Sequence, residues 1–246
     1  MLRSLGSIRK YAQEYQSHRS TLSRGKYSSA APYKNCIAAP LIEYEDNVLV
    51  LDVIPPMELH LMLGVVNRLY DYLDKALEES ASSIKAKDWA DLLYIERRHY
   101  HGGQFIGNHC SKLLDEVDIL EQLLIESGAY IGIPYVEAFR KFKIVKDMCF
   151  GYHLYEGYDT AVKNFKTAYL NLDIPVSLKV HIVFDHIVQF CEKYSTGLGL
   201  FSEHALESSH YNFKPFWEKS YKVAMNHPIY GQKILDSVHM YNALHV

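Results

Sequence analysis

Two histidines in the last third of the 246-residue chain have the spacing of metal ligands. His181 and His186 form an H-x4-H pair, which falls within the range that zinc sites use for two histidines. On a regular helix five residues turn through about 500°, so the two rings would point about 140° apart. They can meet at one ion only if the helix ends or bulges between them. The spacing alone favours packed histidines, and a zinc site is the alternative.

Two glutamates follow the histidines on a second predicted helix. Gly197 and Gly199 end the preceding helix, and Ser202 can cap the new one. Glu203 and Glu207 are four residues apart and therefore share one helix face. A carboxylate that a helix presents at the edge of a sheet can hold Mg²⁺, which prefers oxygen ligands. Two carboxylates are too few for a two-metal site, and a solvated acidic helix turn is the alternative.

A glycine-rich segment at 101–114, H-G-G-Q-F-I-G-N-H-C-S-K-L-L, precedes another predicted helix. The free backbone N–H groups at such a helix start can bind a phosphate. The segment lacks the G-K-[ST] ending of a P-loop, so a tight turn that leads into a helix is the alternative. Basic residues beside it are candidates for contacts with nucleic-acid phosphates, although an exposed polar helix end would account for them equally well. These residues are Arg97, Arg98, His99 and His101.

The composition is that of an ordinary protein with a packed core, with 48% hydrophobic and 22% charged residues. The net charge of -3 gives no overall basic bias toward nucleic acid. The four cysteines are scattered without a C-x-x-C pair, which argues against a disulfide framework and a self-contained zinc knuckle. Isolated thiols fit a reducing compartment, the cytosol or nucleus. We see neither a secretory signal nor a run of about 18 apolar residues, so we expect no membrane association.

Helical periodicity dominates the chain after Pro56 and predicts a mainly α protein. Apolar residues recur three or four positions apart, which places one apolar stripe on each helix. Residues 1–45 form a basic N-terminal segment with helical potential. Residues 46–56, which contain N-V-L-V-L-D-V-I before two prolines, predict a single strand. One strand cannot stand alone, so the strand implies a sheet that the sequence does not supply.

Four segments, taken in order, resemble the C-terminal part of Transib-type DDE transposases and the related V(D)J recombinase catalytic subunit. The resemblance covers almost the whole chain. It implies that residues 57–195 form a helical insertion domain in a truncated RNase H-like core, and that residues 196–246 hold the closing catalytic helix and a C-terminal helix. The segments are R-S-L-G-S-I-R-K-Y-A-Q-E-Y near the start, I-P-P-M-E-L-H-L-M-L-G-V-V-N-R-L-Y at 54–70, the glycine-rich segment, and K-V-H-I-V-F-D-H-I-V-Q-F-C-E through F-S-E-H-A-L-E-S-S-H.

The resemblance assigns roles to the residues already singled out. In such enzymes two aspartates and a glutamate hold Mg²⁺ or Mn²⁺ for DNA cleavage and strand transfer. Glu207 matches the glutamate, and Glu203 matches an acidic neighbour. His181 and His186 match the histidine half of a structural zinc site. Neither catalytic aspartate can be placed, Asp52 matches neither of them, and the C-x-x-C half of the zinc site is absent from this sequence.

The resemblance therefore implies a fragment or domesticated derivative of a nuclear DDE transposase. Together with the upstream half that this sequence lacks, such a protein would bind transposon-end-like DNA, with a homodimer or a companion subunit as possible assemblies. The chain alone would be unable to cut DNA. The main alternative is a non-enzymatic helical module that binds protein partners. A third reading is an unrelated metalloenzyme that uses histidines and carboxylates. Salt-sensitive DNA binding favours the transposase reading, and salt-insensitive self-association favours the interaction module.

Overall fold

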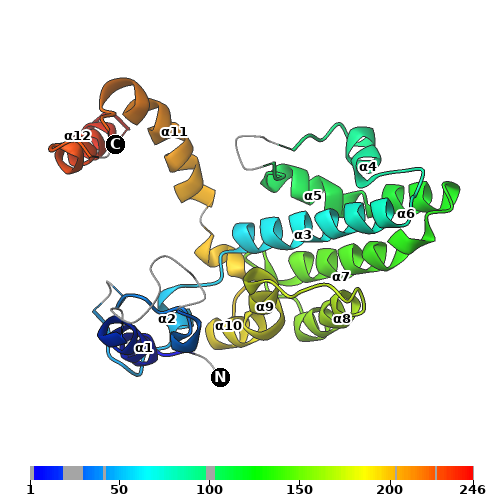
Figure 1. Cartoon of the computed structure of the whole chain (residues 1–246), viewed down its shortest axis with the longest axis horizontal. Coiled ribbons are helices and arrows are strands. Elements are labelled where there is room, and N and C mark those ends of the chain that lie inside the picture. Colours follow the sequence, from blue (N-terminus) through cyan, green and yellow to red (C-terminus); the bar gives the residue numbers. More distant parts are fainter. Residues whose placement is uncertain are drawn as a thin grey trace.

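The computed structural model describes residues 3–18, 30–40, 43–97, 103–202, 204–224 and 226–245. The described chain is built mainly from helices, which confirms the predicted fold class (Figure 1). The helices are α1 (Leu5–His18), η3 (Ala31–Tyr33), α2 (Val50–Val53), α3 (Glu58–Glu79), α4 (Ala86–Leu92), α5 (Gly107–Asp115), α6 (Val117–Glu126), η5 (Tyr130–Gly132), α7 (Ile133–Cys149), α8 (Tyr158–Leu170), α9 (Leu178–Asp185), α10 (Ile187–Tyr194), η6 (Leu198–Phe201), α11 (His204–Ser220) and α12 (Tyr230–His245).

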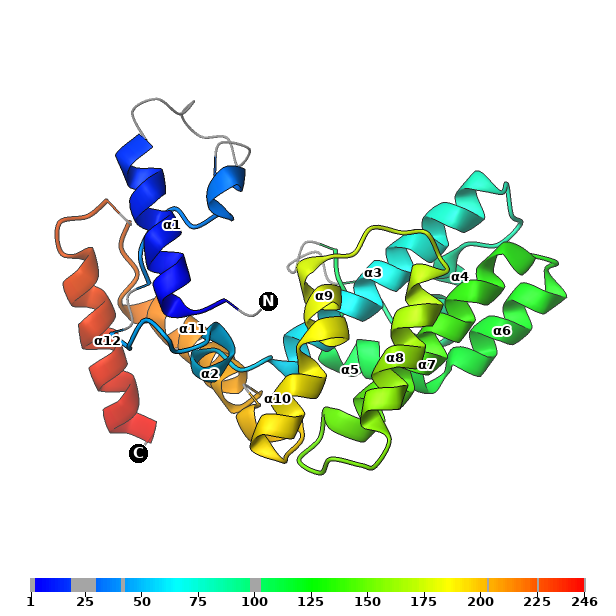
Figure 2. The ribbon, with the colours of Figure 1, turned by 90° about the horizontal axis from the view of Figure 1, so that it is seen from below.

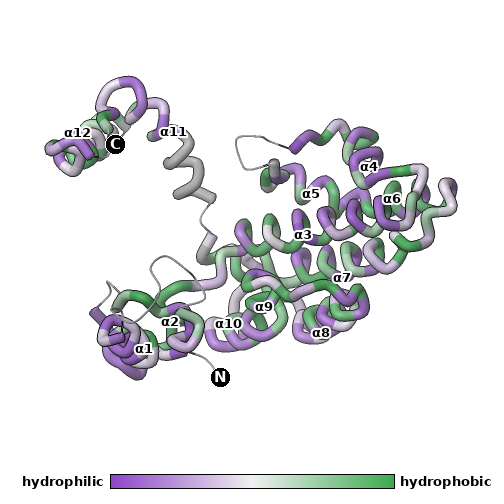
Figure 3. Tube along the Cα trace, in the orientation of Figure 1, coloured by the Kyte–Doolittle hydropathy of each residue, from purple (hydrophilic) through white to green (hydrophobic). Residues whose placement is uncertain are grey.

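Helices α3–α10 form a bundle around one apolar core, with α3 beside α7 (Figure 1). The stripe predicted for α3 faces this core, because Val66, Leu73 and Leu77 are almost completely buried. Figure 3 shows hydrophobic and hydrophilic residues alternating along the bundle helices, as expected for helices with one buried face. Aromatic rings fill the centre: the centroids of Trp89 and Phe139 lie 5.4 Å apart in an edge-to-face contact.

The strand predicted for 46–56 is wrong at Val50–Val53, which form the helical turn α2. The extended backbone before α2 makes an isolated antiparallel bridge between Ser4 and Leu49. The Leu5 N–H donates to the Val48 carbonyl at 2.8 Å, and the Val50 N–H donates to the Arg3 carbonyl at 2.9 Å. The N-terminal segment therefore satisfies backbone groups for which the sequence had implied a sheet. A short aliphatic run does not by itself distinguish strand from helix.

The N-terminal segment and a C-terminal hairpin lie on one side of the bundle (Figure 1 and Figure 2), and the view in Figure 1 shows them apart from each other. An ion pair between Lys193 on α10 and Asp52 on α2 ties the N-terminal segment to the bundle. Helices α11 and α12 pack mainly on each other, with the rings of Phe213 and Tyr241 5.3 Å apart. No helix in the described part of the chain is long and apolar enough to span a membrane.

Candidate metal centre

The helix that carries the histidine pair breaks between the two histidines. Helix α9 ends at Asp185 and α10 begins at Ile187, with His186 between them at φ -126° and ψ -27°. The break brings the rings of His181 and His186 together, with centroids 4.9 Å apart and planes at 86°. The condition set by the five-residue spacing is therefore met, since the helix ends between the two residues.

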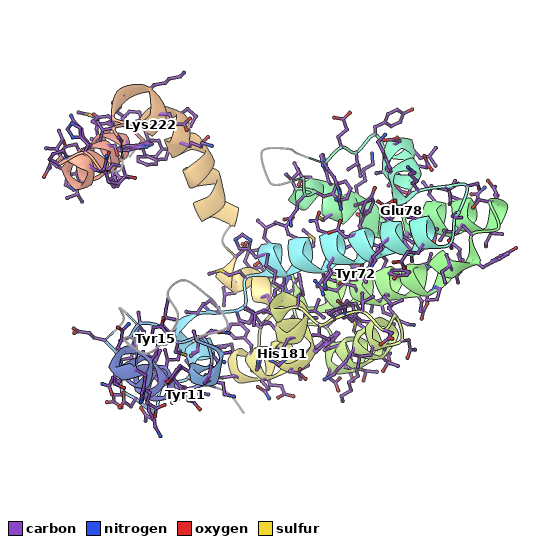
Figure 4. All side chains as sticks on the ribbon, viewed as in Figure 1. Tyr11, Tyr15, Tyr72, Glu78, His181 and Lys222 are labelled. Atoms are coloured by element: carbon purple, nitrogen blue, oxygen red, sulfur yellow. The ribbon has the colours of Figure 1, made fainter. Side chains whose placement is uncertain are left out.

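Helix α9 is held firmly on the bundle surface. It packs against both α3 and α8 (Figure 2). The Ser177 side chain caps its start by accepting a hydrogen bond from the Val180 N–H at 3.3 Å. Val180 and Val183 are fully buried and fix the rotation of the helix about its axis. His181 projects from the opposite, exposed side of α9, where it is labelled in Figure 4.

The His181 ring is oriented by a carboxylate. Its Nδ1 lies 2.9 Å from Oδ2 of Asp185, one helical turn further along α9. The other oxygen of Asp185 accepts a hydrogen bond from Lys166 Nζ on α8 at 2.7 Å. This contact with Lys166 holds the pKa of Asp185 below its ordinary value, and His181 adds to the effect. A neutral His181 that donates from Nδ1 keeps the lone pair of Nε2, which can bind a metal.

His186 is half-buried, and its Nδ1 atom is buried without a hydrogen-bond partner. Burial is the largest cause that lowers the pKa of His186, while nearby Asp185 and a hydrogen bond with Gln189 oppose this shift. The neutral ring is therefore favoured, which is the form that binds zinc. A buried nitrogen without a partner is costly in free energy, and His186 shares this feature with Nδ1 of His109.

The pair fits half of a zinc site. Two rings supply two nitrogens, whereas a structural zinc site is almost always four-coordinate. Within the described ranges, no group of three or more histidine, cysteine or acidic side chains could hold a metal. Cys149 and Cys191 lie in the apolar core, where the Cys149 thiol donates a hydrogen bond to the Val145 carbonyl at 3.1 Å.

Of the two glutamates, Glu203 lies outside the described residues, and Glu207 lies in α11, where only its place in the helix is described. The chain reaches α11 through a close backbone contact. The Gly199 N–H donates to the Gly151 carbonyl at 3.1 Å, and a side chain at Gly197 would collide with the same carbonyl. The point at which the chain leaves the bundle toward Glu207 is thus fixed.

Arg97 is the one proposed phosphate contact that falls within the described residues; Arg98, His99 and His101 lie outside them. Its guanidinium lies over the rings of Tyr70 and Phe105, 4.7 and 5.1 Å from their centroids. It also forms an ion pair with Asp71. An arginine held by two rings and a carboxylate is already engaged, so its surroundings favour a structural role.

The glycine-rich segment packs against α3 where it is described. Asn67 on α3 accepts a hydrogen bond from the Phe105 N–H at 2.8 Å and donates one to the Phe105 carbonyl at 3.3 Å. A Cβ at Gly107, the first residue of α5, would lie 2.9 Å from a methyl of Leu59. The start of α5 is therefore covered by α3, which favours a tight turn over a phosphate cradle.

Sequence reasoning singled out the two histidines but missed Asp185 and Lys166. The four-residue interval between His181 and Asp185 on a predicted helix was a visible signal, because such positions share a face. The contribution of Lys166 was not visible, since it reaches Asp185 from another helix.

Comparisons of the chain with models of known protein families, with curated proteins and with solved structures found no match.

Proposed function

We propose that this chain is the helical insertion and closing helix of a DDE-transposase-like protein, in which His181 and His186 form half of a structural zinc site. The observation that supports this most is the break between α9 and α10, which brings together two rings that a continuous helix would separate. The orphaned Nδ1 of His186 supports it further. When bound, zinc would join this surface to the part of the protein that supplies the remaining two ligands.

In this proposal Glu207 is the chain's contribution to a Mg²⁺ or Mn²⁺ site, and Glu203 is its acidic neighbour. One glutamate cannot assemble a two-metal phosphoryl-transfer site, because each ion needs several oxygen ligands. In this proposal the chain alone therefore does not cut DNA. Cleavage requires carboxylates from a further segment or a companion subunit. The setting for such a protein is the nucleus.

The zinc half-site is tested by titrating the purified, metal-free chain with Zn²⁺ in competition with a chromophoric chelator. We expect one Zn²⁺ per chain, and weaker binding in His181→Asn and His186→Asn. His239→Asn is the control, because His239 is an exposed residue on α12. Equal affinity in the wild type and in the doubly substituted chain would contradict the half-site.

The DNA function is tested with duplex DNA over a range of salt concentrations. We expect binding that weakens steeply as salt rises, because phosphate contacts release counterions. With Mg²⁺ or Mn²⁺ we expect no nicking by the chain alone. Metal-dependent nicking that disappears in Glu207→Gln would show that the chain is itself a nuclease and would overturn this part of the proposal.

One observation favours a second function, a helical module that binds protein partners. Helix α12 leaves large apolar side chains exposed, among them Leu235 at 54% and Leu244 at 64%. Exposed apolar surface of this kind often marks an interaction site. Self-association that is insensitive to salt, without DNA binding, would favour this function. Substituting Leu235 and Leu244 by glutamine would then abolish the association.

A further inference from the structure

Three side chains from two helices form a continuous chain of polar contacts that ends at the histidine pair. Lys166 on α8 donates to Oδ1 of Asp185 at 2.7 Å, and Oδ2 of the same carboxylate lies 2.9 Å from Nδ1 of His181. Asp185 is the last residue of α9, directly before the break at His186. The contacts therefore join the bundle to the ring that faces solvent.

We propose that Asp185 and Lys166 are positioning residues that hold His181 in the orientation required for metal binding. This inference rests on the proposed zinc half-site. Histidines that bind a metal almost always donate their other ring N–H to a carboxylate, a backbone carbonyl or a water. Such a partner fixes the tautomer and the ring orientation, and it makes the metal-binding nitrogen more basic. Asp185 is such a carboxylate partner for Nδ1 of His181.

The Asp185 carboxylate decides which ring nitrogen of neutral His181 carries the proton. A neutral imidazole carries its proton on either ring nitrogen, and the hydrogen bond made by one nitrogen decides which form is present. An acceptor at Nδ1 selects the Nδ1–H form and leaves the Nε2 lone pair free. The same hydrogen bond restrains a half-exposed side chain, so less rotamer entropy is lost when a metal binds.

Lys166 restrains the carboxylate itself. Its ammonium occupies Oδ1 of Asp185 and also lies 5.6 Å from the centroid of the Phe184 ring. With Oδ1 held by Lys166, Asp185 presents Oδ2 to His181. A second pair on α8 offers a matched control: Lys163 donates to Asp159 at 2.9 Å, with the i,i+4 spacing that His181 and Asp185 also have.

The tautomer is measured first, without metal, by two-bond ¹H–¹⁵N NMR correlations of the histidine rings. We expect the Nδ1–H form of His181 in the wild type. We expect its loss in Asp185→Ala, which removes the acceptor, and its weakening in Lys166→Met. Asp159→Asn should leave the spectrum of His181 unchanged. Circular dichroism checks folding, which these surface substitutions should preserve because Asp185 and Lys166 are about 40% exposed.

Zinc affinity is measured next, by the same chelator competition. We expect Asp185→Asn, which keeps an acceptor but loses the charge, to weaken Zn²⁺ binding by about 10–100-fold, as for other outer partners of metal-bound histidines. Asp159→Asn should bind as the wild type does. An unchanged tautomer in Asp185→Ala together with an unchanged affinity in Asp185→Asn would overturn the positioning role while leaving the half-site standing. Failure of the wild type to bind Zn²⁺ would overturn the half-site, and the tautomer measurement would then decide whether Asp185 orients His181.

Discussion

Gly197 lies where the chain leaves the bundle toward α11, and we predict that alanine at this position destabilises the fold. A Cβ at Gly197 would lie 2.1 Å from the Gly151 carbonyl oxygen, although ordinary contact begins at 3.4 Å. The carbonyl oxygens of His153 and Cys149 would lie at 3.0 and 3.1 Å. All three are backbone atoms, which cannot rotate aside as a side chain can. The backbone of Gly197, at φ -74° and ψ 169°, is itself open to alanine.

The cost therefore arises from the contact and not from the backbone conformation. Overpacking of a close contact costs about 1–3 kcal/mol, and the depth of this overlap places Gly197→Ala at the upper end. For a chain of this size each kcal/mol lowers the melting temperature by roughly 2–4 °C. Urea and thermal denaturation followed by circular dichroism would measure both quantities.

Gly151 provides the matched control on the other side of the same contact. A Cβ at Gly151 meets no atom within 4 Å, so Gly151→Ala adds a methyl group to open space. Alanine gives the unfolded chain less conformational entropy than glycine does. Gly151→Ala should therefore leave the free energy of unfolding unchanged or raise it by up to about 1 kcal/mol. A Gly197→Ala chain as stable as the wild type, or an equal loss in Gly151→Ala, would refute the contact argument.

Three further predictions concern the bundle. Asn67→Ala should lower the free energy of unfolding by about 1–3 kcal/mol in urea titrations, because it leaves the Phe105 N–H without its buried partner; an unchanged stability would contradict this. Leu73→Ala should cost about 2–5 kcal/mol through the cavity that it leaves, and Leu235→Ala on exposed α12 should cost far less. The Arg140 side chain holds the pKa of Glu121 below its ordinary value, so this pair should stabilise the fold above pH 4.5 and cease to do so as the pH falls through the folded-state pKa. In denaturation curves measured over a pH series, Glu121→Gln should reduce this loss of stability at low pH.

The helices of the bundle were predictable because burial leaves a periodic trace in the sequence. In α3 the stripe that ends at Leu77 alternates with charged residues, and the structure buries its central and C-terminal members. The segment before Pro55 carried no such trace. Its conformation depends on contacts with Ser4 and Leu5, more than forty positions away, and no local pattern encodes those hydrogen bonds.

The site was predictable only in part, for a related reason. The spacing identified His181 and His186 as a pair that could meet only if the helix ended between them. The spacing did not encode that helix end, which the structure shows where α9 packs on α3 and α8. The surroundings of Arg97 were likewise not predictable. The sequence left a phosphate contact and an exposed helix end equally open, and the fold places the guanidinium over two aromatic rings that lie far from each other in the sequence.

The histidine pair is separable from the folding of the bundle. Buried apolar residues such as Val180 and Ile187 hold α9 and α10, while His181 projects from the exposed side. Small zinc domains differ, because metal binding supplies much of their folding free energy. Here the proposed ion would meet two side chains on helices that are already folded. Removing the proposed ion should therefore leave the helices described here folded.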